Sequence, residues 1–196
     1  IITSNIKIND LYKDGLQRDQ FKPFINTMKE LCYEIELVID GDYRKSASNL
    51  LDRFFYPLNE ETNFKINQIF RKLTKDKIKS SKNLKIKGRT FEIKNYFEKI
   101  ARFDFDYLCN QNIGAEDYIK IAEACEYIII ENIPKFNEEN INKQKRFITL
   151  IDILYEKKIP LMTSSSVDLE NFGSSKALTD SFKRTLSRLY ELTSIN

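Results

Sequence analysis

The sequence predicts an α/β fold, because segments with the apolar period of a strand alternate with segments that have the period of a helix. Two regions carry the prediction. The apolar start Ile1-Ile2 leads through a polar loop into an amphipathic helix and then into the apolar run 34–39. A second alternation of helices and strands covers residues 115–165. Units of this kind favour a parallel sheet.

The first region is expected to hold a strand, a helix and a second strand. Residues 1–5 end a strand, since a β-branched pair precedes small polar residues. A helix is expected over 18–33, where Pro23 is tolerable in the first turn. Its apolar residues recur at helical spacing: Phe21, Phe24, Ile25, Met28, Leu31 and Cys32. The run 34–39 is the second strand, closed by the turn residues 40–42.

The middle of the chain is expected to contain a helix and a β-hairpin. The helix covers 60–75 and directs these residues inward: Phe64, Ile69, Phe70 and Leu73. Two alternating runs about Gly88 predict a hairpin at 84–94. Its lysines are interpreted as a solvated face rather than as a basic patch.

The last part is expected to alternate between helices and strands. Helices are predicted over 115–125, 138–157 and 176–193, and strands over 127–134 and 159–164. The Ser-rich stretch 163–175 is expected to be a surface loop outside any site.

Composition excludes several classes of function. The formal net charge of +3, from 32 basic and 29 acidic residues, is too balanced to argue for nucleic-acid binding. The chain has no His, which excludes His-based triads and His-containing zinc sites. Its three cysteines form no C-x-x-C pair, which favours reduced, mostly buried thiols in a reducing compartment. No Gly is followed by Lys, so the sequence contains no phosphate-binding loop of the G-x-x-x-x-G-K-[ST] type.

The opening stretch nevertheless has residues suited to phosphoryl transfer. Asn5 would lie at the carboxyl edge of a parallel sheet, where α/β folds bind ligands. Arg18 opens the following helix. Phosphoryl transfer needs a polar group that aligns water and a guanidinium that neutralises charge on the phosphoryl oxygens. On pattern alone, the alternative is that Asn5 caps a turn and Arg18 is a surface charge.

Several blocks of the sequence resemble the ZapE and AFG-like family of AAA+ ATPases. The first block is "TSN" at 3–5 with "DLYKDGLQR" at 10–18, and "ARFDFDYLC" at 101–109 is similarly specific. Further blocks follow in the family's order: "YPLN" at 56–59, "GRTFEI" at 88–93, "GAEDYIKIA" at 114–122, "KRFITLIDILYEKKIPLM" at 145–162 and "FKRTLSRLYEL" at 182–192. The resemblance therefore covers essentially the whole chain.

The resemblance implies a fold and a domain organisation. The chain would be the C-terminal part of a P-loop AAA+ ATPase, with the last parallel strands and an elaborated α+β lid that carries the hairpin. Residues 1–44 would end the ATPase core, with the sensor-1 strand, the arginine-finger helix and the last strand. Residues 45–196 would form the lid-like region. The uncapped start at Ile1-Ile2 is then expected because the beginning of that strand, and the phosphate-binding loop before it, lie upstream.

The resemblance also implies roles for individual residues. Asn5 would be sensor 1, and Arg18 would be the arginine finger that reaches the ATP site of a neighbouring subunit. Arg102, Arg184 and Arg188 are candidates for sensor 2, which contacts the nucleotide. The cofactors would be ATP and Mg²⁺, and no metal-ligating residue is assigned. The 196 residues alone are expected to be inactive.

The implied partners are further copies of the chain in a ring, taken as a hexamer, and protein clients. In bacteria the clients would belong to the cell-division machinery at the FtsZ ring, in the cytoplasm. In eukaryotes the place would be the mitochondrion, with inner-membrane proteins as clients. Peripheral membrane association is compatible with this reading, and no nucleic acid is expected. The alternative is a nucleotide-free adaptor that retains an AAA+ tail as a binding surface.

Overall fold

The computed structural model describes residues 6–13, 15, 17–35 and 53–194. The chain divides into two units, Ile1–Tyr43 and Arg44–Asn196. Each unit is described by itself. The interpretation of these regions as the end of an ATPase core and a lid stays a prediction.

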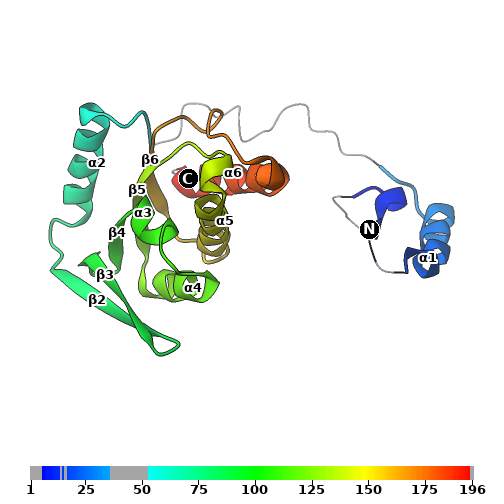
Figure 1. Ribbon diagram of the computed structural model, residues 1–196, viewed down its shortest axis with the longest axis horizontal. Coiled ribbons are helices and arrows are strands. Elements are labelled where there is room, and N and C mark those ends of the chain that lie inside the picture. Colours follow the sequence, from blue (N-terminus) through cyan, green and yellow to red (C-terminus); the bar gives the residue numbers. More distant parts are fainter. Residues whose placement is uncertain (1–5, 14, 16, 36–52, 195–196) are drawn as a thin grey trace. The chain divides into compact units, whose positions relative to one another are not determined.

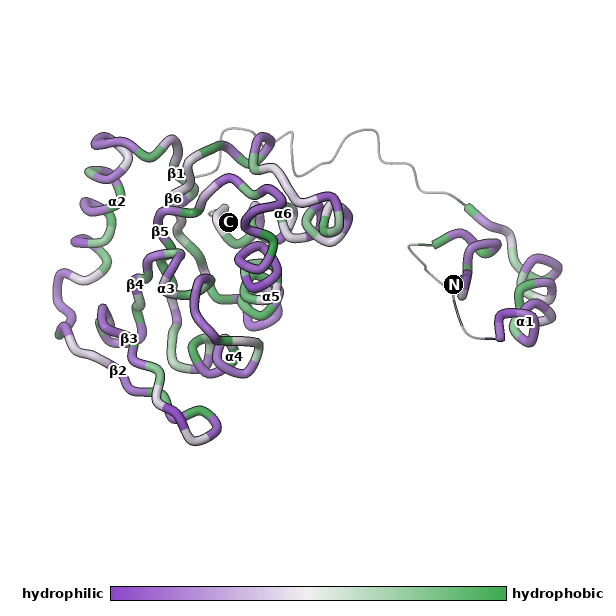
Figure 2. Tube along the Cα trace, in the orientation of Figure 1, coloured by the Kyte–Doolittle hydropathy of each residue, from purple (hydrophilic) through white to green (hydrophobic). Residues whose placement is uncertain are grey.

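The first unit contains a 3₁₀ turn, η1 (Ile8–Asp10), and the helix α1 (Arg18–Leu31). The predicted helix is confirmed, and it ends at Leu31 because Cys32 adopts an extended conformation. Polar and apolar residues alternate along the turns of α1, as expected for an amphipathic helix (Figure 2). Within the described part of the chain, however, Ile25 is the one residue of this helix that is buried. Phe24 and Leu31 are exposed.

The two strands predicted for the first unit fall largely outside the described residues. Residues 1–5 and 36–39 belong to that remainder. Glu34 and Ile35 are described, and they have no regular structure.

The second unit is built on a six-stranded sheet with the order β1-β6-β5-β4-β3-β2. The strands are β1 (Phe54–Phe55), β2 (Lys79–Ile86), β3 (Arg89–Phe97), β4 (Ile100–Asp104), β5 (Tyr127–Ile133) and β6 (Leu161–Ser165). The pairs β1–β6, β6–β5 and β5–β4 are parallel, whereas the pairs β4–β3 and β3–β2 are antiparallel. The predicted α/β fold is confirmed, with six α-helices among the described residues.

Helices cover both faces of this sheet (Figure 1). They are α2 (Glu60–Leu73), α3 (Phe105–Cys109), α4 (Ala115–Ala124), α5 (Ile141–Glu156) and α6 (Thr179–Thr193), with 3₁₀ turns at Glu138–Asn140 (η2) and Lys176–Leu178 (η3). Ile66 of α2 packs with Ile129 of β5 on one face. Ile128 and Ile130 point to the other face, into the core shared with α3 to α6.

Five buried phenylalanines form a cluster in the core between the sheet and helices α3 to α6. They are Phe105, Phe136, Phe147, Phe172 and Phe182, and Phe136 lies between 5.3 and 5.9 Å, centroid to centroid, from each of the others. The loop around Phe172 needs Gly173, because its φ is +70° and a Cβ there would lie 2.5 Å from the carbonyl oxygen of Phe136. The cluster therefore ties α3, α5 and α6 to the two loops.

The predicted hairpin is present and longer than expected. It runs from Lys79 to Phe97, with its turn at Lys87-Gly88. The helices predicted in the C-terminal half are confirmed, although α5 and α6 each begin three residues later, after a 3₁₀ turn.

Two predictions about side chains were wrong. The first residues of the Ser-rich stretch 163–175, Thr163 to Ser165, are buried because β6 lies between β1 and β5 with both faces covered. Ser175 is also buried. Phe64 was expected to point inward, but it is 67% exposed because the buried stripe of α2 passes through Ile66. Strands β1 and β4 and helix α3 were not predicted.

The three cysteines are free, and Cys109 and Cys125 are buried. Burial raises the pKa of the Cys109 thiol, and it raises the pKa of Cys125 to about 12. Both are therefore protonated and unreactive near neutral pH. No helix within the described residues is long and apolar enough to cross a membrane.

We expect Phe136→Ala to lower the free energy of unfolding by about 3–5 kcal/mol, because it removes the ring at the centre of the phenylalanine cluster. Phe64→Ala is the matched control, with an expected change within about 0.5 kcal/mol, since that ring is largely in solvent. Urea unfolding followed by circular dichroism measures both. Equal destabilisation by the two substitutions would contradict the assigned core.

Candidate functional site

The residues predicted to act on a nucleotide are Asn5, Arg18, Arg102, Arg184 and Arg188. Asn5 lies outside the described residues. The four arginines are described, and each has contacts that fix its guanidinium.

Arg18 is the first residue of α1 and is half-buried. The residue before it, Gln17, has a φ of 59°, so the backbone turns sharply into the helix. The Nη2 of Arg18 donates to the carbonyl oxygen of Asn9 at 2.8 Å, which ties the helix start to the preceding loop. Its Nε is buried, with no hydrogen-bond partner among the described residues. The loop therefore holds the guanidinium by one nitrogen and leaves another without a partner.

The first turn of α1 carries a balanced set of charges next to Arg18. Asp19 pairs with Lys22 at 2.5 Å. The pKa of Asp19 is lowered by the hydrogen bond and charge of Lys22, and Arg18 adds to this effect. A carboxylate in the first turn is favourable with the helix dipole. Asp19 is thus engaged within its own helix.

Arg102 is fully engaged on the face of the sheet that α2 covers. Its Nε and Nη2 both donate to Glu131 of β5, the latter at 2.7 Å, and Nη1 donates to Asn67 of α2 at 2.9 Å. The guanidinium also lies over the ring of Phe70, at 4.8 Å from its centroid. The side chains of Arg102 and Glu131 are only 20% and 16% exposed. Reaching a nucleotide would require this bidentate pair to break.

Arg184 and Arg188 lie one turn apart on α6 and share one carboxylate. Arg184 donates to Asp152 of α5 at 3.2 Å, and Arg188 donates to the other oxygen of Asp152. Arg188 also lies over the ring of Tyr155, at 5.0 Å. The two arginines differ in freedom, because the side chain of Arg184 is 60% exposed and that of Arg188 is 21% exposed.

The structure thus divides the sensor-2 candidates into two groups. Arg184 and Arg188 are brought together between α5 and α6, and Arg102 lies toward α2 on the opposite face of the sheet. The sequence alone could not make this distinction, because the partners Asp152 and Glu131 lie about 30 residues away from the arginines.

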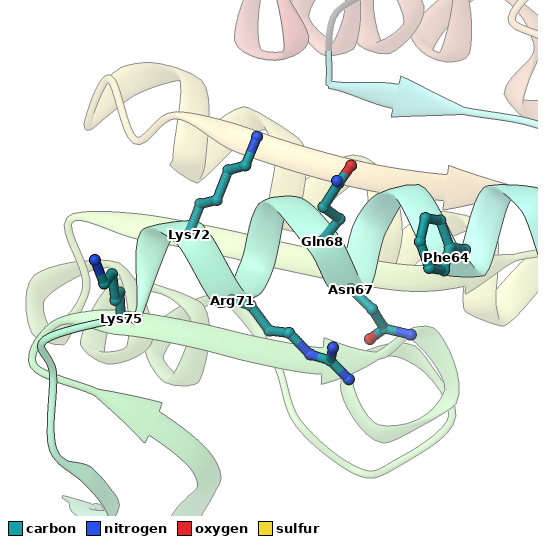
Figure 3. Close-up of a pocket in the computed structure, with 6 residues that line it drawn as sticks. All are labelled: Phe64, Asn67, Gln68, Arg71, Lys72 and Lys75. Atoms are coloured by element: carbon teal, nitrogen blue, oxygen red, sulfur yellow. The ribbon is translucent and has the colours of Figure 1, made fainter.

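A basic pocket that the sequence reading did not identify lies along α2 (Figure 3). Its volume is about 490 Å³, and it is lined by Phe64, Asn67, Gln68, Arg71, Lys72 and Lys75. Asn67 and Arg71 point to one side of the helix in Figure 3, and Gln68 and Lys72 point to the other. The three cations Arg71, Lys72 and Lys75 make this part of the surface positively charged, although Arg71 and Lys72 point to opposite sides. The sequence could have indicated this pocket, because Arg71 and Lys75 are four residues apart and such residues lie on the same side of a helix.

No cluster of metal-binding side chains occurs among the described residues. They contain no group of three or more His, Cys, Asp or Glu side chains that could hold a metal ion. Asp152 and Glu131, the carboxylates closest to the arginine candidates, are already paired with them. We therefore assign no step to a metal held by these residues.

Comparison with known proteins adds information that geometry cannot supply. The family model described as AFG1-like ATPase matches residues 1–196. The chain is 30% identical to lactation elevated protein 1 homolog B of Danio rerio over 98% of its own length and 39% of the relative's. It is 28% identical to cell division protein ZapE of Escherichia coli K12, over 99% of its length and 52% of that protein's.

The chain therefore spans about half or less of these curated relatives. An uncharacterized protein of Schizosaccharomyces pombe is 32% identical over 86% of the chain and 38% of its own length. No solved structure matches.

We expect Glu131→Gln to destabilise the second unit by about 1–3 kcal/mol, because it leaves the guanidinium of Arg102 partly buried without its counter-charge. The double substitution Arg102→Met with Glu131→Gln should recover part of that loss, since the uncompensated charge is gone. Urea denaturation measures the free energy of unfolding of both variants and of a control. The matched control is Glu126→Gln, which breaks the exposed pair with Lys99 and should leave the unfolding midpoint unchanged. A loss from Glu126→Gln as large as that from Glu131→Gln would contradict the assignment.

Proposed function

Because this chain belongs to the family of AFG1-like ATPases, we propose that it supplies the trigger residues of an ATPase, Asn5 and Arg18. Asn5 acts as sensor 1 and positions the attacking water. Arg18 acts as the arginine finger in the ATP site of a neighbouring subunit. The family uses ATP, and Mg²⁺ belongs to the same chemistry.

The observation that carries this proposal is the setting of Arg18. An arginine finger has to keep its guanidinium in a defined place until the neighbour's nucleotide arrives. Arg18 starts a 14-residue helix and is tied to Asn9 by one nitrogen, with its Nε left without a partner among the described residues. Because the guanidinium of Arg18 is held by a backbone carbonyl and forms no ion pair within the described residues, it can donate to phosphoryl oxygens without first losing a counter-charge, in contrast to Arg102.

Charge neutralisation is the chemical task of this residue. In phosphoryl transfer, negative charge spreads over the equatorial oxygens of the transferred group, and a positioned guanidinium stabilises it. The chain's own part is to orient Arg18 through η1 and the start of α1 and to align water through the amide of Asn5. Hydrolysis then needs two subunits, which supports a ring, with a hexamer as the expected size.

Among the sensor-2 candidates we favour Arg184. It makes one contact to Asp152 at 3.2 Å and is the most exposed of the three, so reorientation toward a nucleotide costs the fewest interactions. Arg188 would remain as the partner of Asp152 and keep that carboxylate neutralised. Arg102 serves the packing of α2 on the sheet.

Coupling of hydrolysis to the remodelling of protein partners is the proposed outcome. One relative is named a cell division protein. A role at the bacterial division ring, in the cytoplasm, is proposed by analogy with that relative. A mitochondrial role on inner-membrane proteins, with peripheral attachment to the membrane, is the corresponding proposal for a eukaryotic source.

We expect Arg18→Ala to reduce ATP hydrolysis by about 10³–10⁵-fold in the intact natural protein, because charge on the transferred phosphoryl group is no longer neutralised. Binding of a non-hydrolysable ATP analogue should stay nearly unchanged, since the finger acts in the transition state. Phosphate release and fluorescence titration measure the two quantities.

Lys22→Ala is the matched control for this experiment, since it removes an exposed cation one turn further along the same helix. It should retain most of the activity. If Arg18→Ala hydrolyses ATP as fast as the parent protein, Arg18 is a surface charge and the nucleotide-free adaptor becomes the better account.

A further inference from the structure

Strand β2 forms an open edge of the sheet. In the part of the chain that the structure describes, β2 pairs with β3 alone, and it lies at the outer margin of the sheet (Figure 1). It is eight residues long, and its first five residues, 79–83, are all exposed. An edge strand presents a row of unpaired backbone N–H and C=O groups to its surroundings. The opposite edge, β1, has only two residues.

The segment that contains β2 and its neighbours in the chain is strongly basic. Residues 71–94 contain ten Lys or Arg and two Asp or Glu, a net charge of +8 in a chain whose total is +3. Part of this charge is neutralised, since Lys77, Lys87 and Arg89 pair with Glu98, Glu116 and Asp117.

The three lysines of β2 itself are not neutralised. Lys79, Lys82 and Lys85 form no ion pair within the described part of the chain. They are spaced three residues apart, which is about 10 Å along a strand. Their long, flexible stems let each ammonium group reach the open edge from either face of the sheet. The edge is therefore lined with positive charge over about 20 Å.

These two features together identify the kind of partner. Lysines on an edge strand prevent pairing with a like-charged edge, including that of a second copy of this chain. They favour a strand that carries carboxylates at matching positions. A nucleic acid would use the charge but not the free backbone groups, and β2 contains no aromatic residue on which bases could stack.

We propose that β2 is a docking edge for an acidic, extended segment of a partner protein. The segment adds to the sheet as a further strand, with backbone hydrogen bonds to β2 and its carboxylates against Lys79, Lys82 and Lys85. Ile78, which directly precedes β2 and is 75% exposed, offers an apolar contact beside the first lysine. This interaction does not depend on ATP hydrolysis, so it stands independently of the proposed function.

The test uses the full chain and a capped eight-residue peptide of Glu and Thr, with Glu at the positions opposite Lys79, Lys82 and Lys85 of β2. Fluorescence anisotropy measures its dissociation constant, and amide hydrogen exchange reports on residues 79–86. We expect binding, together with slower exchange in β2. Reversing the three lysines, with Lys79→Glu, Lys82→Glu and Lys85→Glu, should weaken binding by about tenfold or more. The same peptide with alternate backbone nitrogens methylated should lose a similar factor, because it keeps the charge and cannot pair as a strand.

The matched control reverses three exposed lysines elsewhere, with Lys145→Glu, Lys157→Glu and Lys176→Glu. It changes the net charge equally, and its affinity for the peptide should stay within about threefold of the parent chain. The proposal is overturned by any of four results: an equal loss in this control, equal binding of the methylated peptide, unchanged exchange in β2, or no binding of the peptide. In the last case, binding of a single-stranded oligonucleotide would assign the lysines to nucleic acid.

Discussion

Strand β5 has to be buried on both of its faces, and the arrangement of the second unit follows from that constraint. Ile128 and Ile130 point to one side and Ile129 to the other, and all three are inaccessible to solvent. One layer of helices cannot satisfy such a strand. The connections after β4, β5 and β6 supply the helices of one face, and the connection from β1 to β2 supplies α2 for the other. Burying the isoleucines thus fixes where every crossover goes.

The same constraint decides what each arginine can do. Arg102 and Glu131 emerge on the face toward α2, where they are partly shielded from water and neutralise each other with help from Asn67. Their pairing compensates the cost of removing two charges from solvent. Arg184 lies on the outer side of α6 and remains half in water. Two arginines that look alike in the sequence therefore differ in the work needed to present them to a phosphate.

Charge and edge exposure coincide at β2 for a related reason. The helices of the second unit cover the parallel strands, and the antiparallel hairpin forms one margin of the sheet, with Leu84 and Ile86 in the core and residues 79–83 exposed (Figure 1). A strand in that position needs charge to prevent association with other edges, and the lysines of β2 provide it. From sequence, the lysines of this stretch were interpreted as a solvated face. Their place on an edge strand gives them a second role. Their charge protects an edge and selects what can add to it.

The sequence by itself determined the α/β class, the helices α1, α2, α4, α5 and α6, and the hairpin, because these depend on local periodicity and on turn residues such as Gly88. It also identified the family, through blocks that include Arg18. Tertiary structure alone decided the burial of Thr163 to Ser165, since a local pattern that predicts a strand does not say whether both of its faces will be covered. It also decided that Phe64 faces solvent and which carboxylate holds each arginine. Those outcomes depend on contacts between segments far apart in the chain, which no local pattern encodes.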